Sequence, residues 1–317
     1  MKILCITPVS SQSRQGNGVT ARRWVRILRS LGHRVTMAQH YHGAPCDLML
    51  ALHARRSFPA IEHFRRLHPS FPLIVALTGT DLYSDIQTSP EAQQSLELAT
   101  RLIVLQPRGV DELQSHLRAK TRVIYQSVTG PKRLVPKPKT TFDVCVLGHL
   151  RPVKDPFRTA LASRLLPQTS RLRVLHVGQA LSDDMAACAE AEMATNPRYR
   201  WRGELPRWQA RRVLAQSHVM VLSSTMEGGA NVISEALAVP VPTLASRISG
   251  SVGLLGEDYP GFFPVGDTAA LALLLEKTET DAGFYHELVA QCQHLASLIH
   301  PAHEQQAWKQ LLQELAR

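Results

Sequence analysis

The feature that most constrains this chain is a repeated alternation of short, continuously apolar segments with segments of helical spacing. In the first part of the chain, apolar runs rich in Val, Ile and Leu lie at residues 2–7, 33–39, 47–53, 73–79, 101–106 and 121–127. Segments with the spacing of helices lie among them, at 20–32, 57–68, 90–99 and 108–117. Continuously apolar strands that alternate with helices are typical of a parallel sheet covered on both faces. The pattern therefore predicts a doubly wound α/β domain.

The same alternation restarts after a linker-like stretch, TGPKRLVPKPKT at 129–140, which has three prolines and no apolar period. Strands are expected at 142–148, 171–178, 199–203, 219–224 and 241–246, and helices at 155–166, 182–195, 206–216 and 230–238. We therefore predict two Rossmann-like domains, 1–135 and 136–300, that face each other across a cleft. The last segment, 301–317, is expected to form a C-terminal helix that packs on either domain.

Composition excludes several classes of protein. The longest apolar stretches fall far short of the roughly 20 residues that cross a bilayer, and the N-terminus reads as a first strand rather than a signal peptide. The sequence therefore predicts a cytoplasmic protein without stable membrane insertion. Its five cysteines form no CxxC, which favours neither a disulfide framework nor a zinc site. The chain has no DxD triplet and no paired His–carboxylate spacing, so we expect no metal and no cofactor.

The charge is distributed unevenly along the chain. Residues 1–140 hold 20 Lys+Arg and 8 Asp+Glu, a net +12, whereas the remainder holds 16 and 18, a net −2. A field of one sign attracts nucleic acid, anionic lipid or a small phosphorylated substrate, and an Arg-rich surface kept for solubility is the competing explanation. Aromatic residues make up only 6% and are not interleaved with the basic ones. Stacking platforms for nucleic acid are therefore not expected.

Ligands of doubly wound sheets bind at the carboxyl ends of the strands, so candidate binding residues are expected in the loops there. After the first strand, Gly16, Asn17 and Gly18 precede a predicted helix whose first N–H groups would face an anion. In the second half, Arg151 and Lys154 stand on one short loop after a strand. A guanidinium beside an ammonium can neutralise a diphosphate, although basic residues at loop ends are more often solvated.

The stretch SSTMEGGANVISEAL, residues 223–237, joins a buried strand to a helix that begins near Ala230. Gly228 and Gly229 allow a ligand to approach the backbone, and the helix end offers N–H groups to an anion. Glu227 and Glu235 would accept the vicinal hydroxyl pairs of two sugars on either side of phosphates. The simpler alternative is that Glu227 caps the helix and Glu235 is a surface residue.

These motifs carry a resemblance that covers essentially the whole chain. A Gly-x-x-Arg-x-x-Lys run, Gly148 to Lys154, followed by two glutamates with seven residues between them resembles the GT-B retaining glycosyltransferases of family four (GT4). The resemblance implies that Arg151 and Lys154 hold the diphosphate of a nucleotide sugar, that Glu227 touches the donor sugar and that Glu235 holds the ribose. It also implies an acceptor site in the N-terminal domain. The resemblance places Arg202, Gly203 and Leu205 near the base, which is usually uracil. The further donor-binding residues that it implies are Gly148, Gly228, Gly229, Ala230 and Asn231.

The chain is short for this family, and the segments RPVKDPF and TGTDLY stand where the family usually has other sequence motifs. In this it resembles the selenosugar synthases of selenoneine biosynthesis, which implies transfer of a sugar from UDP-GlcNAc or UDP-glucose to the selenium of selenophosphate, with possible functional coupling to selenophosphate supply. The acceptor residues would be Gly16, Asn17, Gly18, His53, Thr78, Thr80 and Asp81. Asp81 is a candidate base but fits a structural carboxylate better, and His53 fits a packed histidine at a strand end.

Other functions stay open. One is a conventional GT4 enzyme that acts on a phosphorylated sugar or a lipid at a membrane surface, which would also explain the basic half. Another is an epimerase or a noncatalytic nucleotide-sugar sensor on the same fold.

Overall fold

The computed structural model describes residues 1–10, 16–131 and 135–315, and the described chain forms two compact units. The first unit comprises residues 1–127, 227–231 and 300–317, and the second comprises 128–226 and 232–299. The chain first passes from the first unit to the second between residues 127 and 128, whereas the boundary predicted from the sequence falls after residue 135. The C-terminal helix, for which the sequence left two partners open, belongs to the first unit.

The first unit is built on a six-stranded sheet in which every pairing is parallel. Its strands are β1 (Lys2–Ile6), β2 (Arg34–Ala38), β3 (Leu48–Leu52), β4 (Leu73–Ala76), β5 (Arg101–Val104) and β6 (Thr121–Val123). The order β2-β1-β3-β4-β5-β6 reverses direction between β1 and β3. In open parallel sheets the carboxyl edge at such a switch point is where ligands bind.

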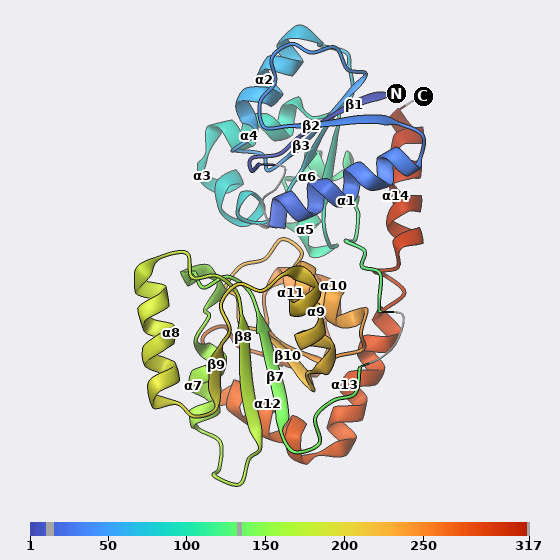
Figure 1. Ribbon diagram of the computed structural model, residues 1–317. Coiled ribbons are helices and arrows are strands. Elements are labelled where there is room, and N and C mark those ends of the chain that lie inside the picture. The colour runs from blue at the N-terminus through green and yellow to red at the C-terminus, as the bar shows by residue number, and fades with distance from the viewer. Residues whose placement is uncertain (11–15, 132–134, 316–317) are drawn as a thin grey trace. The chain divides into compact units, whose positions relative to one another are not determined.

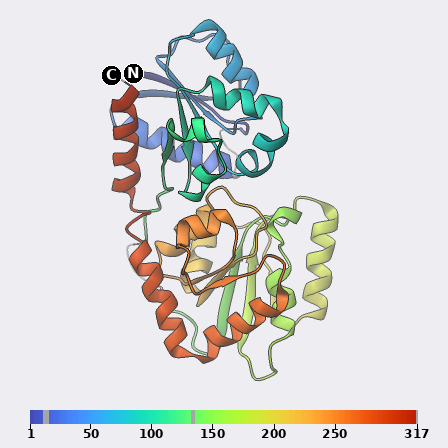
Figure 2. The same ribbon diagram turned by 180° about the vertical axis from the view of Figure 1, so that it is seen from behind.

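Side chains alternate between the two faces of this sheet because successive Cβ atoms of a strand point in opposite directions. In β1, Ile3 and Cys5 pack into one buried cluster, while Leu4 and Ile6 pack into the other. The helices of the first unit are α1 (Gly16–Ser30), α2 (Phe58–Leu67), η1 (Asp81–Asp85), α3 (Ile86–Thr88), α4 (Pro90–Leu98), α5 (Arg108–Asp111), α6 (Ser115–Arg118) and α14 (Pro301–Leu315). Figures 1 and 2 show α1 and α14 side by side against the sheet.

A buried carboxylate fixes the C-terminal helix on the first unit. Glu304 of α14 is 2% exposed and accepts hydrogen bonds from Trp24 Nε1 at 2.7 Å and from Arg23 Nε at 3.1 Å. The backbone N–H of Ser127 donates to its other oxygen at 2.9 Å. Next to it, the rings of Trp24 and Trp308 meet edge to face with centroids 5.1 Å apart. The helix is thus held both by apolar packing and by a fully paired buried charge.

The second unit has its own six-stranded parallel sheet. Its strands are β7 (Phe142–Leu147), β8 (Leu172–Val177), β9 (Tyr199–Trp201), β10 (Val219–Leu222), β11 (Thr243–Ser246) and β12 (Phe262–Phe263). The order β12-β11-β10-β7-β8-β9 places the switch point between β7 and β10. This is the strand order of dinucleotide-binding doubly wound domains.

The helices of the second unit follow the strands and cover the sheet, as Figure 1 shows. They are η2 (Pro152–Lys154), α7 (Arg158–Arg164), α8 (Asp183–Thr195), α9 (Arg207–Gln216), α10 (Asn231–Leu237), α11 (Ser249–Leu255), α12 (Thr268–Thr280) and α13 (Ala282–Leu295). Three of them begin at side-chain caps, in which Ser182, Asp267 and Asp281 each accept a backbone N–H of the first turn.

The predicted fold class, an α/β protein with two doubly wound domains, is confirmed. Two local expectations were wrong. The helix expected over 108–117 is two short helices, α5 and α6, and the first helix begins at Gly16, four residues before the expected start. The elements α11, β12, α12 and α13 were not predicted; of these, the strand β12 has only two residues, too short an apolar run to recognise. Among the described residues, no helix has the length and apolar character needed to cross a membrane.

Candidate functional site

In the second unit, the predicted diphosphate-binding residues lie on the loop that leaves β7, at one side of the switch point. Gly148 directly follows the strand, Arg151 precedes the 3-10 turn η2, and Lys154 ends that turn. Asp155 follows with a left-handed φ of 43°, which turns the chain into α7. Arg151 is exposed and Lys154 half-buried, so the loop presents its cationic residues within four positions.

The loop that leaves β10, on the other side of the switch point, is hydrogen-bonded to this basic loop. Ser223 is 2% exposed, and its Oγ donates to the carbonyl oxygens of Lys154 at 3.2 Å and Asp155 at 2.9 Å. The backbone N–H of Thr225 donates to the carbonyl of Val153 at 2.9 Å. These bonds place the predicted basic loop beside the segment that leads to the glutamate–glycine motif, a relation that spacing along the chain does not reveal.

A third loop of the second unit closes on Gly148 from the neighbouring strand β8. A Cβ added at Gly178 would lie 1.8 Å from the carbonyl oxygen of Gly148, so only glycine fits there. His176 is 1% exposed, and its Nε2 donates to the same oxygen at 3.2 Å, while Nδ1 accepts from the hydroxyl of Tyr199 at 2.9 Å. Burial lowers the pKa of His176 to about 4. Gly178 was missed by sequence reasoning, although a glycine at the end of a strand is a recognisable signal.

Glu235, the predicted ribose-binding carboxylate, lies in α10 and forms an ion pair with Arg207. The Nη2 of Arg207 is 3.0 Å from Oε1 of Glu235, whose side chain is only 14% exposed. Arg207 begins α9, directly after the predicted base-contacting residues Arg202, Gly203 and Leu205. The pair therefore joins the two elements that were predicted to hold the nucleoside. Arg207 was not predicted, and its only signal is its place at the start of the next helix.

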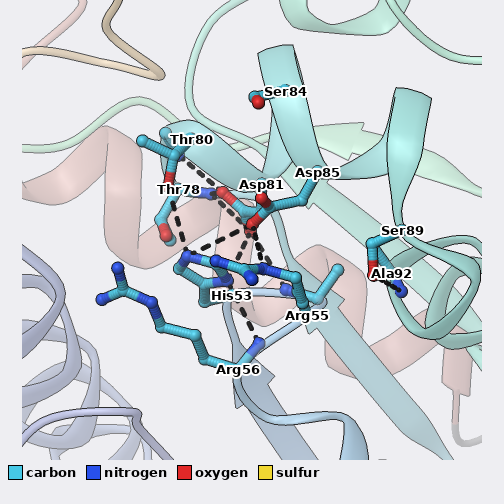
Figure 3. Close-up of polar contacts among 12 residues, drawn as sticks. His53, Arg55, Arg56, Thr78, Thr80, Asp81, Ser84, Asp85, Ser89 and Ala92 are labelled. Carbon is cyan, nitrogen blue, oxygen red and sulfur yellow. Dashed lines mark hydrogen bonds and ion pairs between the residues drawn. The ribbon is translucent and has the colours of Figure 1, made fainter. Parts of the chain in front are cut away.

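In the first unit, Asp81 ties together the loops that follow β3 and β4 (Figure 3). It is fully buried, and its Oδ1 accepts backbone N–H groups of Thr78 at 3.0 Å and Gly79 at 2.8 Å. Its Oδ2 accepts the backbone N–H of Ala54 at 3.1 Å. A carboxylate enclosed by three backbone donors holds the loops in place, which agrees with the structural interpretation of Asp81 over the base.

His53 packs against this carboxylate and is 2% exposed. Its φ of 74° is left-handed, a strained conformation for a residue with a Cβ. The backbone N–H of Arg56 donates to Nδ1 at 3.4 Å, so the neutral ring carries its proton on Nε2, which lies 3.3 Å from Thr80 Oγ1. Burial lowers the pKa of His53, which keeps the imidazole neutral. Asp85 lies 3.8 Å from Nε2 and is paired with Arg55 at 3.0 Å.

The remaining predicted acceptor residues are divided between two places in the first unit. Gly16, Asn17 and Gly18 form the first turn of α1 itself, rather than a loop before it, and Gly18 is buried. Thr78 and Thr80 are half-buried on the loop after β4. The two sets follow β1 and β4, which are separated in the sheet by β3.

The segment Glu227–Asn231 clusters with the first unit, whereas Glu235 belongs to the second. The two glycines of the segment Glu227–Asn231 are explained by close packing within the first unit. A Cβ at Gly228 would lie 2.6 Å from the backbone of Thr78, and a Cβ at Gly229 would lie 2.5 Å from the side chain of Leu105. Within the part of the chain that the structure describes, no group of three or more His, Cys, Asp or Glu is arranged to hold a metal ion.

This chain is similar to known proteins both in sequence and in fold. The family described as Glycosyl transferases group 1 matches residues 132–294, slightly more than half of the chain, and no curated protein matches the sequence. The fold is similar to that of HepE from Anabaena in complex with UDP and glucose, at 17% identity over 99% of this chain and 100% of that chain, with a TM-score of 0.76.

Two further solved structures give the same result. Sucrose-phosphate synthase from Thermosynechococcus elongatus is 15% identical over 99% of this chain and 98% of that chain, with a TM-score of 0.79. A glycosyltransferase from Rickettsia africae is 12% identical over 100% and 98%, with a TM-score of 0.73. At these identities the likeness concerns the fold, which is the GT-B fold of two doubly wound domains.

Proposed function

Because this chain belongs to the group 1 glycosyl transferases, we propose that it transfers a sugar from a UDP-sugar to a small anionic acceptor. The observation that carries the donor half is the joined pair of loops at the β7/β10 switch point, where Ser223 and Thr225 bond to the loop of Arg151 and Lys154. HepE, which has the same fold, is described in complex with UDP and glucose. UDP-GlcNAc and UDP-glucose are the donors to test.

In this proposal the second unit binds the nucleotide. Arg151 and Lys154 neutralise the negative charge that builds on the diphosphate as the sugar–oxygen bond breaks. Glu235, held by Arg207 through one carboxylate oxygen, keeps the other for the ribose hydroxyls. Glu227 contacts the donor sugar.

For the acceptor we propose selenophosphate, as the resemblance to selenosugar synthases implies. The bond between the anomeric carbon and the UDP oxygen breaks, the electron pair leaves with UDP, and selenium forms the new bond to that carbon. The first unit carries 18 Lys+Arg and 11 Asp+Glu, a net +7, against 18 and 15, a net +3, in the second. The positive field of the first unit favours an anionic acceptor, and part of the excess in the first 140 residues lies in the linker.

A phosphorylated sugar is the second candidate acceptor, since sucrose-phosphate synthase, named for a phosphorylated product, shares the fold. The test is UDP release from UDP-glucose and from UDP-GlcNAc, with and without selenophosphate, followed by mass spectrometry of the sugar product. We expect selenophosphate-dependent UDP release and a selenium-bearing sugar, both lost in Arg151→Ala and Glu227→Ala. Slow UDP release without selenium in the product would remove selenophosphate and leave the donor half in place.

A further inference from the structure

A cavity of about 510 Å³ opens in the first unit, and none of the predicted site residues lines it. Its walls come from the segments that follow three neighbouring strands: Pro8 after β1, residues 39–42 after β2, and residues 56–63 after β3. Because the sheet order runs β2-β1-β3, these segments meet at the switch point of the sheet. Both its position and its volume are those of a small-molecule site.

The polar groups in the cavity walls are basic or neutral. Arg56, His40, His42 and His63 line it, and no Asp or Glu is among its described lining residues. In Figure 3 the Arg56 side chain extends away from the cluster of His53 and Asp81, whereas Arg55 reaches Asp85. Among the described residues, the Arg56 guanidinium has no ion-pair or hydrogen-bond partner. Only its backbone N–H is engaged, by Nδ1 of His53.

The histidines are arranged around a fixed tyrosine. Tyr41 is 5% exposed, its hydroxyl lies 3.0 Å from Nε2 of His68, and its ring meets His63 edge to face at 5.3 Å. His40 and His42 flank it in sequence, with ring centroids 6.1 Å apart. An imidazole offers at least one N–H donor in either protonation state. The cavity therefore combines one unpaired guanidinium with several ring donors, a set suited to oxyanions.

We propose that this cavity holds the phosphate-type group of the acceptor, with Arg56 as its principal contact and His40, His42 and His63 as additional donors. The inference rests on the proposed glycosyl transfer. The guanidinium fork pairs with two oxygens of a tetrahedral dianion. Selenophosphate and the phosphate of a sugar phosphate share this chemistry, and the volume admits either.

If Arg56 contacts the anion, the buried residues His53 and Asp81 act as positioning residues. Asp81 holds the backbone at Ala54, and His53 accepts the backbone N–H of Arg56, so both fix the segment that carries the guanidinium. His53 and Asp81 are almost fully enclosed, so they act on an acceptor through Arg56 rather than by contact. An arginine fixed at its backbone loses less freedom when it binds an anion.

Calorimetric titration of the full chain with inorganic phosphate, glucose 6-phosphate and uncharged glucose tests the site without turnover. We expect one or both anions to bind and glucose not to bind. Arg56→Ala should weaken anion binding about 10- to 100-fold, the range for a charge-assisted hydrogen bond. Arg66→Ala, an exposed arginine on α2 outside the cavity, is the matched control and should bind as the wild type does. Anion binding that is absent, or equal in wild type and Arg56→Ala, overturns the proposal.

Steady-state kinetics with the same variants separates this proposal from the proposed function and identifies the acceptor. Arg56→Ala should raise KM for the active acceptor by the same factor while KM for the UDP-sugar changes less than about 2-fold. If only selenophosphate, or only a sugar phosphate, serves as the acceptor, that compound is the source of the dianion. Normal turnover with an acceptor KM insensitive to Arg56→Ala overturns the cavity and keeps the function. Arg56-dependent phosphate binding without any UDP release keeps the anion site and overturns its role as acceptor site.

Discussion

Arg207 and Glu235 form an ion pair, with 3.0 Å between Nη2 and Oε1, although 28 positions separate them in the chain. The arginine is largely exposed and the glutamate largely buried, at 60% and 14% of their side chains. The arginine thus fixes the orientation of the carboxylate that we propose to hold the ribose. Groups that orient a ligand-binding side chain commonly influence affinity without touching the reacting atoms.

Arg207→Ala should therefore raise KM for the UDP-sugar, by about 3- to 10-fold, and leave kcat within about 2-fold. The reason is that Glu235 loses its orientation while the diphosphate contacts of Arg151 and Lys154 persist. Arg207→Lys should recover part of the affinity. Arg212→Ala, an exposed arginine on the same helix, is the control, and equal KM values in both alanine variants would contradict the positioning role.

Asp81→Ala should lower the free energy of unfolding by about 3 kcal/mol, because three backbone N–H groups lose their acceptor inside the protein. Asp81→Asn keeps one acceptor oxygen and should cost less. Urea denaturation measures both. Asp111→Ala, which breaks an exposed pair with Arg108, should have little effect. If Asp81→Ala were no more destabilising than this control, the structural role of Asp81 would be wrong.

Glu304→Ala should also lower stability by about 3 kcal/mol, since it leaves Arg23 and the N–H groups of Trp24 and Ser127 without their buried partner. Thermal unfolding followed by tryptophan fluorescence is a suitable measurement, because Trp24 and Trp308 lie beside the carboxylate. Glu314 of the same helix pairs with Arg122 near the surface, so Glu314→Ala should change stability much less. Similar losses in both variants would argue against this anchor.

Acid should destabilise the second unit through His176. Its pKa is about 4 in the folded protein, below the usual 6.5, so the unfolded chain binds its proton first as the pH falls. The contribution of His176 to the free energy of unfolding is fully present above pH 6.5. It is lost between pH 6.5 and 4, by roughly 3 kcal/mol in total. Denaturation curves of wild type and His176→Gln across that range measure the difference. Parallel pH dependences of the two proteins would contradict it.

The individual helices and strands could be predicted from the sequence, whereas the contacts between loops could not. Strands such as β3 and β4 are short, wholly apolar runs, and a helix such as α8 begins at a capping serine, so neighbouring residues suffice to recognise them. The basic pair Arg151 and Lys154 was found because it follows a strand. Arg207, Gly178 and the cavity around Arg56 were missed, because their roles depend on contacts between segments that lie tens of residues apart.

By itself the sequence determined that this chain is an α/β protein with two doubly wound domains, because the alternation of apolar and helical segments is a local property. Only the tertiary structure decided the strand orders, the docking of α14 on the first unit through Glu304, and the burial of His53 and Asp81. Strand order is set by long-range backbone pairing, and the burial of a polar residue is set by what packs over it. Neither quantity is contained in the spacing of residues along the chain.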